Sequence, residues 1–156
     1  KEVGDMQNVV IIGAGGTAKA LASKFLQKNI KVHLLNRSEK SLEYFKDKVS
    51  TCQTWDTFVV REYDLVVNTT SAGLKEDIYP CPLPLLENIL ENTSYVADAI
   101  YGKVTPFLKL AQSKNITFKD GADMLLGQGV LANELFVNHT LKLEDIKSCM
   151  QKSFEL

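Results

Sequence analysis

The sequence predicts an α/β fold, with a doubly wound and mostly parallel sheet, in a single domain over residues 1–156. Three observations predict it. Short apolar runs of strand length alternate with amphipathic stretches of helical period, which is typical of a parallel sheet covered by helices. A length of 156 residues suits one domain. A hydrophobic content of 45% is enough to bury a core.

Strands are expected where β-branched and apolar residues cluster between turn residues. The first is the run Val-Val-Ile-Ile that ends at Gly13, and the sixth ends before Asp120. The expected strands cover residues 9–12, 31–35, 52–55, 64–68, 95–99 and 116–119. Residues 69–84 hold one glycine and three prolines and are expected to form a long loop, a type of segment that is often functional.

Helices are expected where apolar residues recur every three or four positions. The first helix has Ala18, Ala22 and Phe25 on one face, and the fourth begins at Pro106, where a missing N–H costs nothing. The expected helices cover residues 18–26, 39–49, 85–90, 106–114, 122–137 and 143–154. The last of them carries the apolar stripe Leu143, Ile146, Met150 and Phe154.

The composition disfavours several classes of function. Lys and Arg total 18 against 19 Asp and Glu, so no basic excess exists to neutralise a nucleic-acid backbone. No apolar stretch approaches the ~20 residues that cross a bilayer, so neither nucleic acid nor membrane is an expected partner. His33 and His139 lack the spacing of metal ligands. Three dispersed cysteines without a signal peptide indicate free structural thiols in a reducing, cytoplasmic setting.

A glycine-rich turn follows the first expected strand and opens the first helix. It has the G-x-G-x-x-[GA] spacing and reads Gly13-Ala14-Gly15-Gly16-Thr17-Ala18. The first glycine permits the tight turn, the second lets a pyrophosphate approach the backbone, and the helix N-terminus offers free N–H groups. Dinucleotide binding in a Rossmann-like fold is the favoured interpretation. A nucleotide-free glycine turn and an S-adenosylmethionine site remain as alternatives.

The tip of the second strand indicates which dinucleotide is bound. NAD sites place a carboxylate there for the ribose hydroxyl, whereas this sequence reads Asn36-Arg37-Ser38. The guanidinium of Arg37 suits a 2′-phosphate, and Asn36, Ser38 and Lys40 can add hydrogen bonds or charge. The sequence therefore predicts NADP(H) in preference to NAD(H). The alternative for Arg37 is an ordinary solvated surface arginine.

Three further features lie near expected strand ends or on a later helix. Residues 68–74 bring small hydrogen-bonding side chains to the end of the fourth strand, although such residues also form ordinary turns. Tyr101 follows the fifth strand, where it either packs or contacts a ligand. Gln128 shares a helical face with Met124, Leu131 and Leu135, so it is either a core hydrogen-bonder or faces a cleft with a polar ligand.

Taken in order, the segments GAGGTAKA, NRS, NTTSAGL, DAIYGKVTPFL and DGADMLLGQG resemble the C-terminal cofactor domain of the shikimate dehydrogenase family. The resemblance runs from about Asn8 to the end of the Gln128 helix. The glycine turn is common to many enzymes, whereas the Tyr-then-Thr-Pro segment and the Gly-x-x-Met-Leu-x-x-Gln helix are specific. The resemblance implies reversible, NADP-dependent interconversion of 3-dehydroshikimate and shikimate, in aromatic amino-acid biosynthesis.

The resemblance also implies roles for individual residues. The pyrophosphate would be held by Gly13, Ala14, Gly15, Gly16 and Thr17, and the adenosine ribose phosphate by Asn36, Arg37 and Ser38. The loop residues Thr69, Thr70 and Ser71 would flank the cofactor, Ala99 and Gly121 would contact its nicotinamide end, and Tyr101 and Gln128 would bind substrate. Two departures stand out: only Gly102-Lys103-Val104 separates Tyr101 from the Thr-Pro pair, and Ser41 replaces a basic residue common in the family.

No catalytic residue is expected in this chain, because the family's acid–base pair lies in an N-terminal substrate domain for which the sequence leaves no room. The expectation is an excised cofactor domain that binds NADP(H) without turnover and shares its substrate with that missing domain. Its terminal helices would then expose apolar stripes, so self-association or a homodimer is expected. The alternatives are a stand-alone NADP(H)-binding regulatory module and a quinate-accepting relative, which would commonly use NAD.

Overall fold

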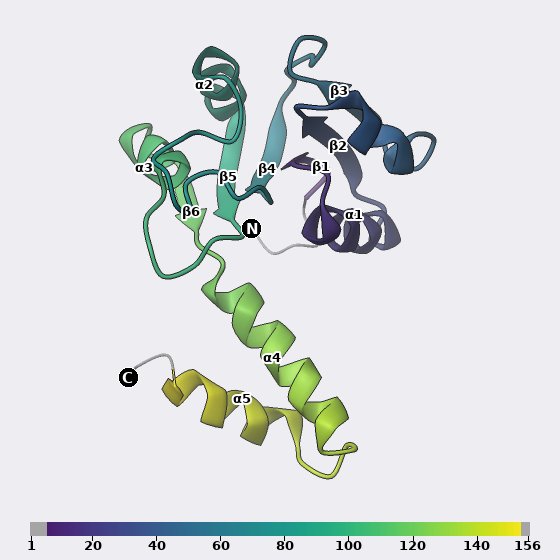
Figure 1. The fold of residues 1–156 in the computed structure, drawn as a ribbon, viewed down its shortest axis with the longest axis vertical. Helices are drawn as coiled ribbons and strands as arrows, with labels where there is room; N and C mark the ends of the chain where they lie inside the picture. The colour runs from purple at the N-terminus through teal and green to yellow at the C-terminus, as the bar shows by residue number, and fades with distance from the viewer. Residues whose placement is uncertain (1–5, 154–156) are drawn as a thin grey trace. The chain divides into compact units, whose positions relative to one another are not determined.

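The computed structural model describes residues 6–153, and its first unit is built on a six-stranded parallel sheet (Figure 1). The strand order is β3-β2-β1-β4-β5-β6, and every neighbouring pair is parallel. The strands are β1 (Asn8–Ile12), β2 (Lys31–Asn36), β3 (Thr51–Thr54), β4 (Tyr63–Asn68), β5 (Thr93–Asp98) and β6 (Thr117–Lys119). The predicted doubly wound α/β fold is therefore confirmed.

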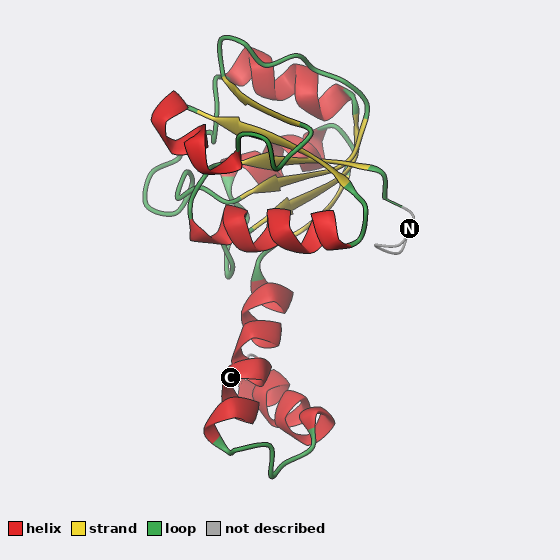
Figure 2. Cartoon of the chain, turned by 90° about the vertical axis from the view of Figure 1, so that its right-hand side faces the viewer, coloured by secondary structure: helices red, strands yellow, loops and turns green. Residues whose placement is uncertain are grey.

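Helices cover both faces of the sheet (Figure 2). In this unit they are α1 (Gly16–Gln27), the 3₁₀ helix η2 (Glu39–Phe45), α2 (Leu83–Glu91) and α3 (Pro106–Ser113). One buried cluster joins the sheet to α1 and η2, and a second joins it to α2 and α3. Strand β1 contributes to both, because Val9 and Ile11 belong to the first cluster whereas Val10 and Ile12 belong to the second. Burial on both faces explains its uninterrupted apolar sequence.

Two elements differ from the sequence-based expectation. Residues 39–49 were expected to form one helix, but η2 ends at Phe45 and Asp47 has a left-handed backbone with φ of 62°. The chain must reverse there to enter β3 at Thr51, so a helix continued to residue 49 would leave too few residues for the turn. The expected loop 69–84 ends earlier, because Pro84 lies in the first turn of α2, where its missing N–H is tolerated.

The chain divides into two compact units, the first ending at Asp120 and the second beginning at Gly121. In the second unit α4 (Ala122–Phe136) packs on α5 (Leu143–Ser153) through a cluster of Leu126, Val130 and Ile146. Gly129 permits the close contact with Met150, whose side chain would collide with a Cβ atom there. In the predicted stripe of α5, Ile146 is buried and Leu143 is exposed, whereas Phe154 lies outside the described residues.

None of the helices in the part of the chain that the structure describes is long and apolar enough to cross a membrane.

Candidate functional site

The candidate site lies at the carboxyl ends of β1, β2 and β4, which are neighbours in the sheet. The pairing register aligns these ends, since Ile12 of β1 lies opposite Leu35 of β2 and Asn68 of β4. After β1 the chain adds β2 and β3 on one side of this strand, and it then crosses to add β4 on the other side. The direction in which strands are added therefore reverses at β1. Ligands of open α/β sheets bind outside the strand ends at such a switch point.

A hollow of about 270 Å³ lies at this edge. It unites three segments that are far apart in the sequence, namely the glycine turn, the tip of β2 and the loop after β4. Among its lining residues are five that the sequence predicts for cofactor binding: Gly13, Asn36, Arg37, Thr70 and Ser71. The hollow therefore brings together the predicted pyrophosphate and ribose-phosphate segments.

The glycine turn has the geometry that anion binding requires. Gly13 has φ of 110°, and its N–H donates to the Leu35 carbonyl at 2.8 Å, which ties the turn to β2. Gly15 is the N-cap residue of α1 and offers no side chain to cap the first N–H groups. A Cβ atom on Gly15 or Gly16 would meet nothing within 4 Å. The helix N-terminus, where Ala14 and Thr17 flank these glycines, is therefore open to an anionic group.

The tip of β2 presents a cation without a competing carboxylate. The Asn36 side-chain amide donates to the Ser38 carbonyl at 2.9 Å, which fixes the turn around Arg37. Arg37 is exposed, lines the hollow and forms no ion pair with any residue between 6 and 153. Ser38 is the N-cap residue of η2, and the exposed Lys40 lies in its first turn. A phosphate ester near Arg37 would thus meet a guanidinium that has no ion-pair partner in the described part of the chain, with Lys40 and the exposed Glu39 both in the first turn of η2.

The loop after β4 is held by its own hydroxyl groups. The Thr69 hydroxyl donates to the Ile12 carbonyl at 2.8 Å, and the Thr70 hydroxyl donates to Asn68 Oδ1 at 2.8 Å. Thr70 Oγ1 in turn accepts the Ala72 N–H at 3.1 Å. Ser71 is exposed on the hollow. Of the three predicted residues, Thr69 and Thr70 therefore use their hydroxyls to shape the loop.

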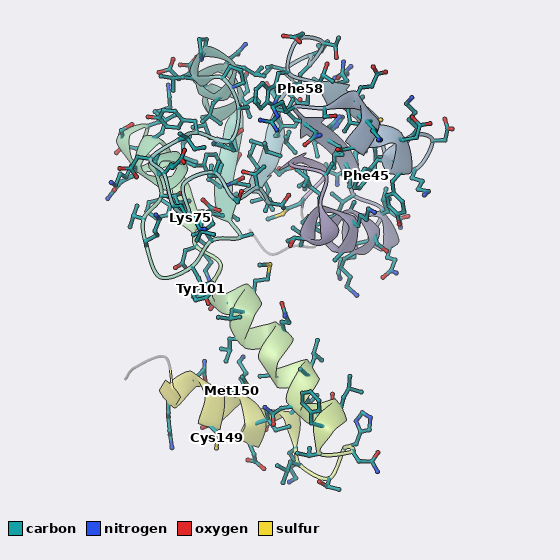
Figure 3. All side chains as sticks on the ribbon, in the orientation of Figure 1. Phe45, Phe58, Lys75, Tyr101, Cys149 and Met150 are labelled. Carbon is teal, nitrogen blue, oxygen red and sulfur yellow. The ribbon has the colours of Figure 1, made fainter. Side chains whose placement is uncertain are left out.

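At the end of β5, the Ala99 N–H donates to the Asn68 carbonyl at 2.9 Å, so this loop continues the edge of the site. Tyr101, labelled in Figure 3, follows with 52% of the residue exposed and belongs to none of the buried clusters. Tyr101 is therefore not a core residue, and both its contact with a ligand and the alternative of packing at the rim with a solvated hydroxyl stay predictions.

Two predicted residues belong to the second unit. Gly121 is the N-cap residue of α4, and Gln128 lies within that helix. Gln128 is exposed, as are Met124, Leu131 and Leu135 on its face. The alternative of a core hydrogen-bonder is therefore wrong for Gln128. The apolar side of α4 that does pack carries Leu126 and Val130, which lie on the opposite part of the helix turn.

Besides Ile12 and Ala72, which lie in the expected first strand and in the segment 68–74, four residues that line the hollow were missed by sequence reasoning: Trp55, Ile78, Tyr79 and Pro80. Trp55 follows β3 directly, so its place at a strand end was a usable signal. Its ring packs against the α2–α3 cluster, and the buried indole N–H has no hydrogen-bond partner in the described structure. The other three come from the long loop, where no periodicity or spacing indicates which residues turn inward.

A buried carboxylate next to the site was also missed. Asp98, the last residue of β5, is 2% exposed and accepts hydrogen bonds from Asn68 Nδ2, the Ile100 N–H and the Thr105 hydroxyl. Burial raises the pKa of Asp98, and these three hydrogen bonds oppose the rise. In the sequence, this aspartate looks like any residue that ends a strand.

Within residues 6–153, no group of three or more His, Cys, Asp or Glu side chains is arranged to hold a metal ion. His33 is 5% exposed in β2, and its Nδ1 lies 2.9 Å from the Thr51 hydroxyl. The His33 ring is therefore buried in the fold and lies within hydrogen-bond distance of a neighbouring strand.

Comparison with known proteins decides the family. A sequence model described as shikimate / quinate 5-dehydrogenase matches residues 1–78, the first half of the chain. The chain belongs to this family. A shikimate dehydrogenase (NADP(+)) from Helicobacter hepaticus is 40% identical over 153 residues, which cover 94% of this chain and 57% of the relative. One from Helicobacter pylori (strain J99) is 35% identical over 148 residues, covering 95% and 54%.

Solved structures of a shikimate dehydrogenase and of another reductase share the fold. The enzyme from Aquifex aeolicus is 26% identical with a TM-score of 0.71, covering 92% of this chain and 53% of the other. A 5-ketofructose reductase from Gluconobacter is 28% identical with a TM-score of 0.70, covering 94% and 56%. The chain thus spans about half the length of the relatives it matches.

Proposed function

We propose that this chain is the NADP(H)-binding part of a shikimate dehydrogenase. In the whole enzyme it would serve the reversible reduction of 3-dehydroshikimate to shikimate, a step of aromatic amino-acid biosynthesis. The observation that carries the proposal is the hollow in which Gly13, Arg37 and Thr70 meet beside an open helix N-terminus. Close relatives are named as NADP(+) enzymes, which supports the same cofactor here.

In this proposal the chain's residues bind and orient the cofactor, which supplies or accepts the hydride. The backbone from Gly13 to Thr17 holds the pyrophosphate, because open N–H groups at the start of α1 attract anions. Asn36, Arg37, Ser38 and Lys40 hold the ribose phosphate, and Trp55 and Tyr79 give the adenosine end an aromatic wall.

The loop after β4 would lie along the cofactor, and the loop after β5 beside its reacting end. Thr69, Thr70 and Ser71 flank the cofactor, and backbone atoms of Ala99 and Gly121 contact the nicotinamide. Tyr101 and Gln128, both exposed residues, would bind substrate oxygens. Both remain predictions from the family resemblance, as do Ala99 and Gly121.

The decisive experiment is calorimetric titration with NADPH and NADH. We expect NADPH to bind more tightly, and Arg37→Ala to weaken NADPH binding by about 10- to 100-fold while NADH binding changes little, since a charge-assisted bond contributes ~1.5–3 kcal/mol. Arg61→Ala is the matched control, because Arg61 is exposed and does not line the hollow. Equal or tighter NADH binding by the unaltered chain would overturn the proposal.

We further propose that the 156-residue chain binds cofactor without appreciable turnover. Hydride transfer requires a substrate held against the nicotinamide and a proton donor within hydrogen-bond reach. By family resemblance that donor lies in a substrate domain, and the matched relatives are nearly twice as long as this chain. Shikimate-dependent formation of NADPH by the purified chain would contradict this part of the proposal.

A quinate-accepting enzyme is the second candidate, because the matching family description includes quinate. Such relatives would commonly use NAD and an acidic residue after the second strand. The same titration therefore separates the candidates, since tight NADH binding favours quinate and selective NADPH binding favours shikimate.

A further inference from the structure

The carboxylate of Asp98 joins three segments that meet at the carboxyl edge of the sheet. Its Oδ1 accepts from Asn68 Nδ2 at 3.0 Å and from the Ile100 N–H at 3.0 Å. Its Oδ2 accepts from the Thr105 hydroxyl at 2.7 Å. Asn68 ends β4, Ile100 lies in the loop after β5, and Thr105 caps α3 by accepting the Leu108 N–H.

On one side this network reaches the hollow. Asn68 Oδ1 accepts both the N–H and the hydroxyl of Thr70, at 3.0 and 2.8 Å. Thr70 and Ala72, which are themselves linked by a hydrogen bond, line the hollow. A continuous chain of hydrogen bonds therefore leads from the wall of the hollow through Asn68 to Asp98.

On the other side the network reaches the residue before Tyr101. Asp98 accepts the N–H of Ile100, the residue that precedes the exposed Tyr101. The carboxylate therefore fixes the backbone just before Tyr101. The two loops are also clamped together beyond Asp98. Lys103 Nζ donates to the Leu74 carbonyl at 2.8 Å, and the Cα of Gly73 lies so close to Thr105 that a Cβ there would be 3.0 Å from Thr105 Cβ.

We propose that Asp98 is a positioning residue that couples occupation of the nucleotide hollow to the placement of Tyr101. The inference rests on the proposed function, because it takes the ligand of the hollow to be the adenosine phosphate end of NADP(H). A buried carboxylate is costly, and it is kept where fully satisfied hydrogen bonds specify one arrangement of the surrounding chain. A ligand that orders Thr70 and Ala72 then orders Ile100 and Tyr101 with them.

The test uses a ligand that cannot touch Tyr101 through a nicotinamide ring. Adenosine 2′,5′-bisphosphate is titrated into the ¹⁵N-labelled chain, and backbone amide shifts are followed by NMR. We expect shifts at Thr70 and Ala72, which line the hollow, and also at Ile100 and Tyr101. In Asp98→Asn, which keeps the volume but removes the charge, the shifts at Thr70 and Ala72 persist and those at Ile100 and Tyr101 are lost.

Two further variants keep the proposal falsifiable if Asp98→Asn does not fold. Thr105→Val removes the hydroxyl that donates to Asp98 and is expected to abolish the remote shifts, those at Ile100 and Tyr101. Thr105→Ser retains the hydroxyl and is expected to keep these shifts. Asp64→Asn is the matched control: Asp64 accepts the N–H groups of Gln7 and Asn8 beside the start of β4, and its loss leaves the coupling intact. If Asp98 had only a structural role, its replacement would lower the stability of the fold. It would not separate the shifts at Thr70 and Ala72 from those at Ile100 and Tyr101.

The outcomes separate this inference from the proposed function. Shifts at Thr70 and Ala72 without any at Ile100 and Tyr101 in the unaltered chain would overturn the coupling and leave nucleotide binding intact. Remote shifts that survive fully in both Asp98→Asn and Thr105→Val would also overturn it. If neither adenosine 2′,5′-bisphosphate nor NADPH shifts the hollow residues, the proposed function fails and the coupling fails with it.

Discussion

Gly13 lies directly against the side chain of Thr69, and a Cβ atom on Gly13 would be 2.6 Å from Thr69 Oγ1. Thr69 cannot swing away freely, because its hydroxyl donates to the Ile12 carbonyl. The backbone of Gly13 has φ of 110°, which is strained for any residue with a Cβ atom. Sterics and backbone conformation therefore both require glycine at this position.

We predict that Gly13→Ala lowers the free energy of unfolding by about 2 kcal/mol, because the added methyl group makes the positive φ unfavourable and also collides with Thr69. Urea denaturation followed by circular dichroism measures the change. An unaltered stability would show that the turn can rearrange.

The matched comparison is Gly15→Ala. Gly15 has φ of −82° and open space around its Cα, so alanine should change the stability by less than about 0.5 kcal/mol. The added methyl would occupy the space proposed for the pyrophosphate and is expected to weaken NADPH binding by about tenfold, or ~1.4 kcal/mol. Undiminished binding would place the pyrophosphate elsewhere.

Trp55 is expected to report nucleotide binding, because it is the chain's one tryptophan and it lines the hollow. NADPH absorbs where indole emits, so binding should quench the emission in a saturable manner. Arg37→Ala should shift the quenching to higher NADPH concentration, and free N-acetyltryptophanamide corrects for simple absorption. Emission that stays constant at a calorimetrically saturating NADPH concentration would argue against this site.

The buried His33 is expected to make the stability of the fold depend on pH. Burial, followed by the charges of Arg61 and Lys31, holds the pKa of His33 below its ordinary value of 6.5. The fold therefore favours the uncharged ring, and the stabilisation is present above about pH 6.5 and lost as the pH falls below it toward the lowered pKa. Urea denaturation should show the free energy of unfolding falling as the pH is lowered from about 7.5 to about 5.5.

The control for this prediction is His33→Gln, which should flatten the dependence over the same range. His139→Gln replaces the exposed second histidine and should leave the effect of His33 in place. Identical pH profiles for His33→Gln and the unaltered chain would contradict the assignment.

The three thiols should differ in reactivity. Burial raises the pKa of Cys81 to about 12, and desolvation also raises the pKa of the half-buried Cys52. Cys149 is exposed on α5. A disulfide reagent at about pH 8 should therefore modify Cys149 first and leave Cys81 intact until the chain is unfolded, since the thiolate is the reactive form. Mass spectrometry of the modified peptides gives the order, and early labelling of Cys81 would refute it.

The second unit exposes apolar side chains that predict self-association. Phe136 is 86% exposed, and Leu131, Leu135 and Leu141 are exposed in the same unit. We expect sedimentation velocity to show concentration-dependent association that Leu135→Ser with Phe136→Ser reduces, because contiguous apolar surface favours contact between copies. A clean monomer at high concentration would count against it.

Much of the fold could be predicted from the sequence, because strands buried on both faces and helices buried on one have distinct periods. The run that includes Val9 and Ile12 is confirmed as the central β1, and the face of Ala18 and Phe25 is confirmed as buried. The expected helix over 39–49 was wrong in type and length, because the chain forms a 3₁₀ helix that ends at Phe45, with Leu42 and Phe45 buried. Its extent depends on how soon the chain must enter β3, which is a tertiary constraint.

The sequence by itself determined the residue types at the tip of β2 and in the glycine turn. The lack of a carboxylate at that tip and the spacing of the glycines can be recognised without knowing the fold. Only the folded sheet decided that Trp55 and Tyr79 share a hollow with Arg37, and that Asn68, Asp98 and Thr105 meet in a buried network. Such contacts depend on strand order and on the path of irregular loops. Periodicity carries no information about either, because it describes which face a residue occupies and not which distant residue it will meet.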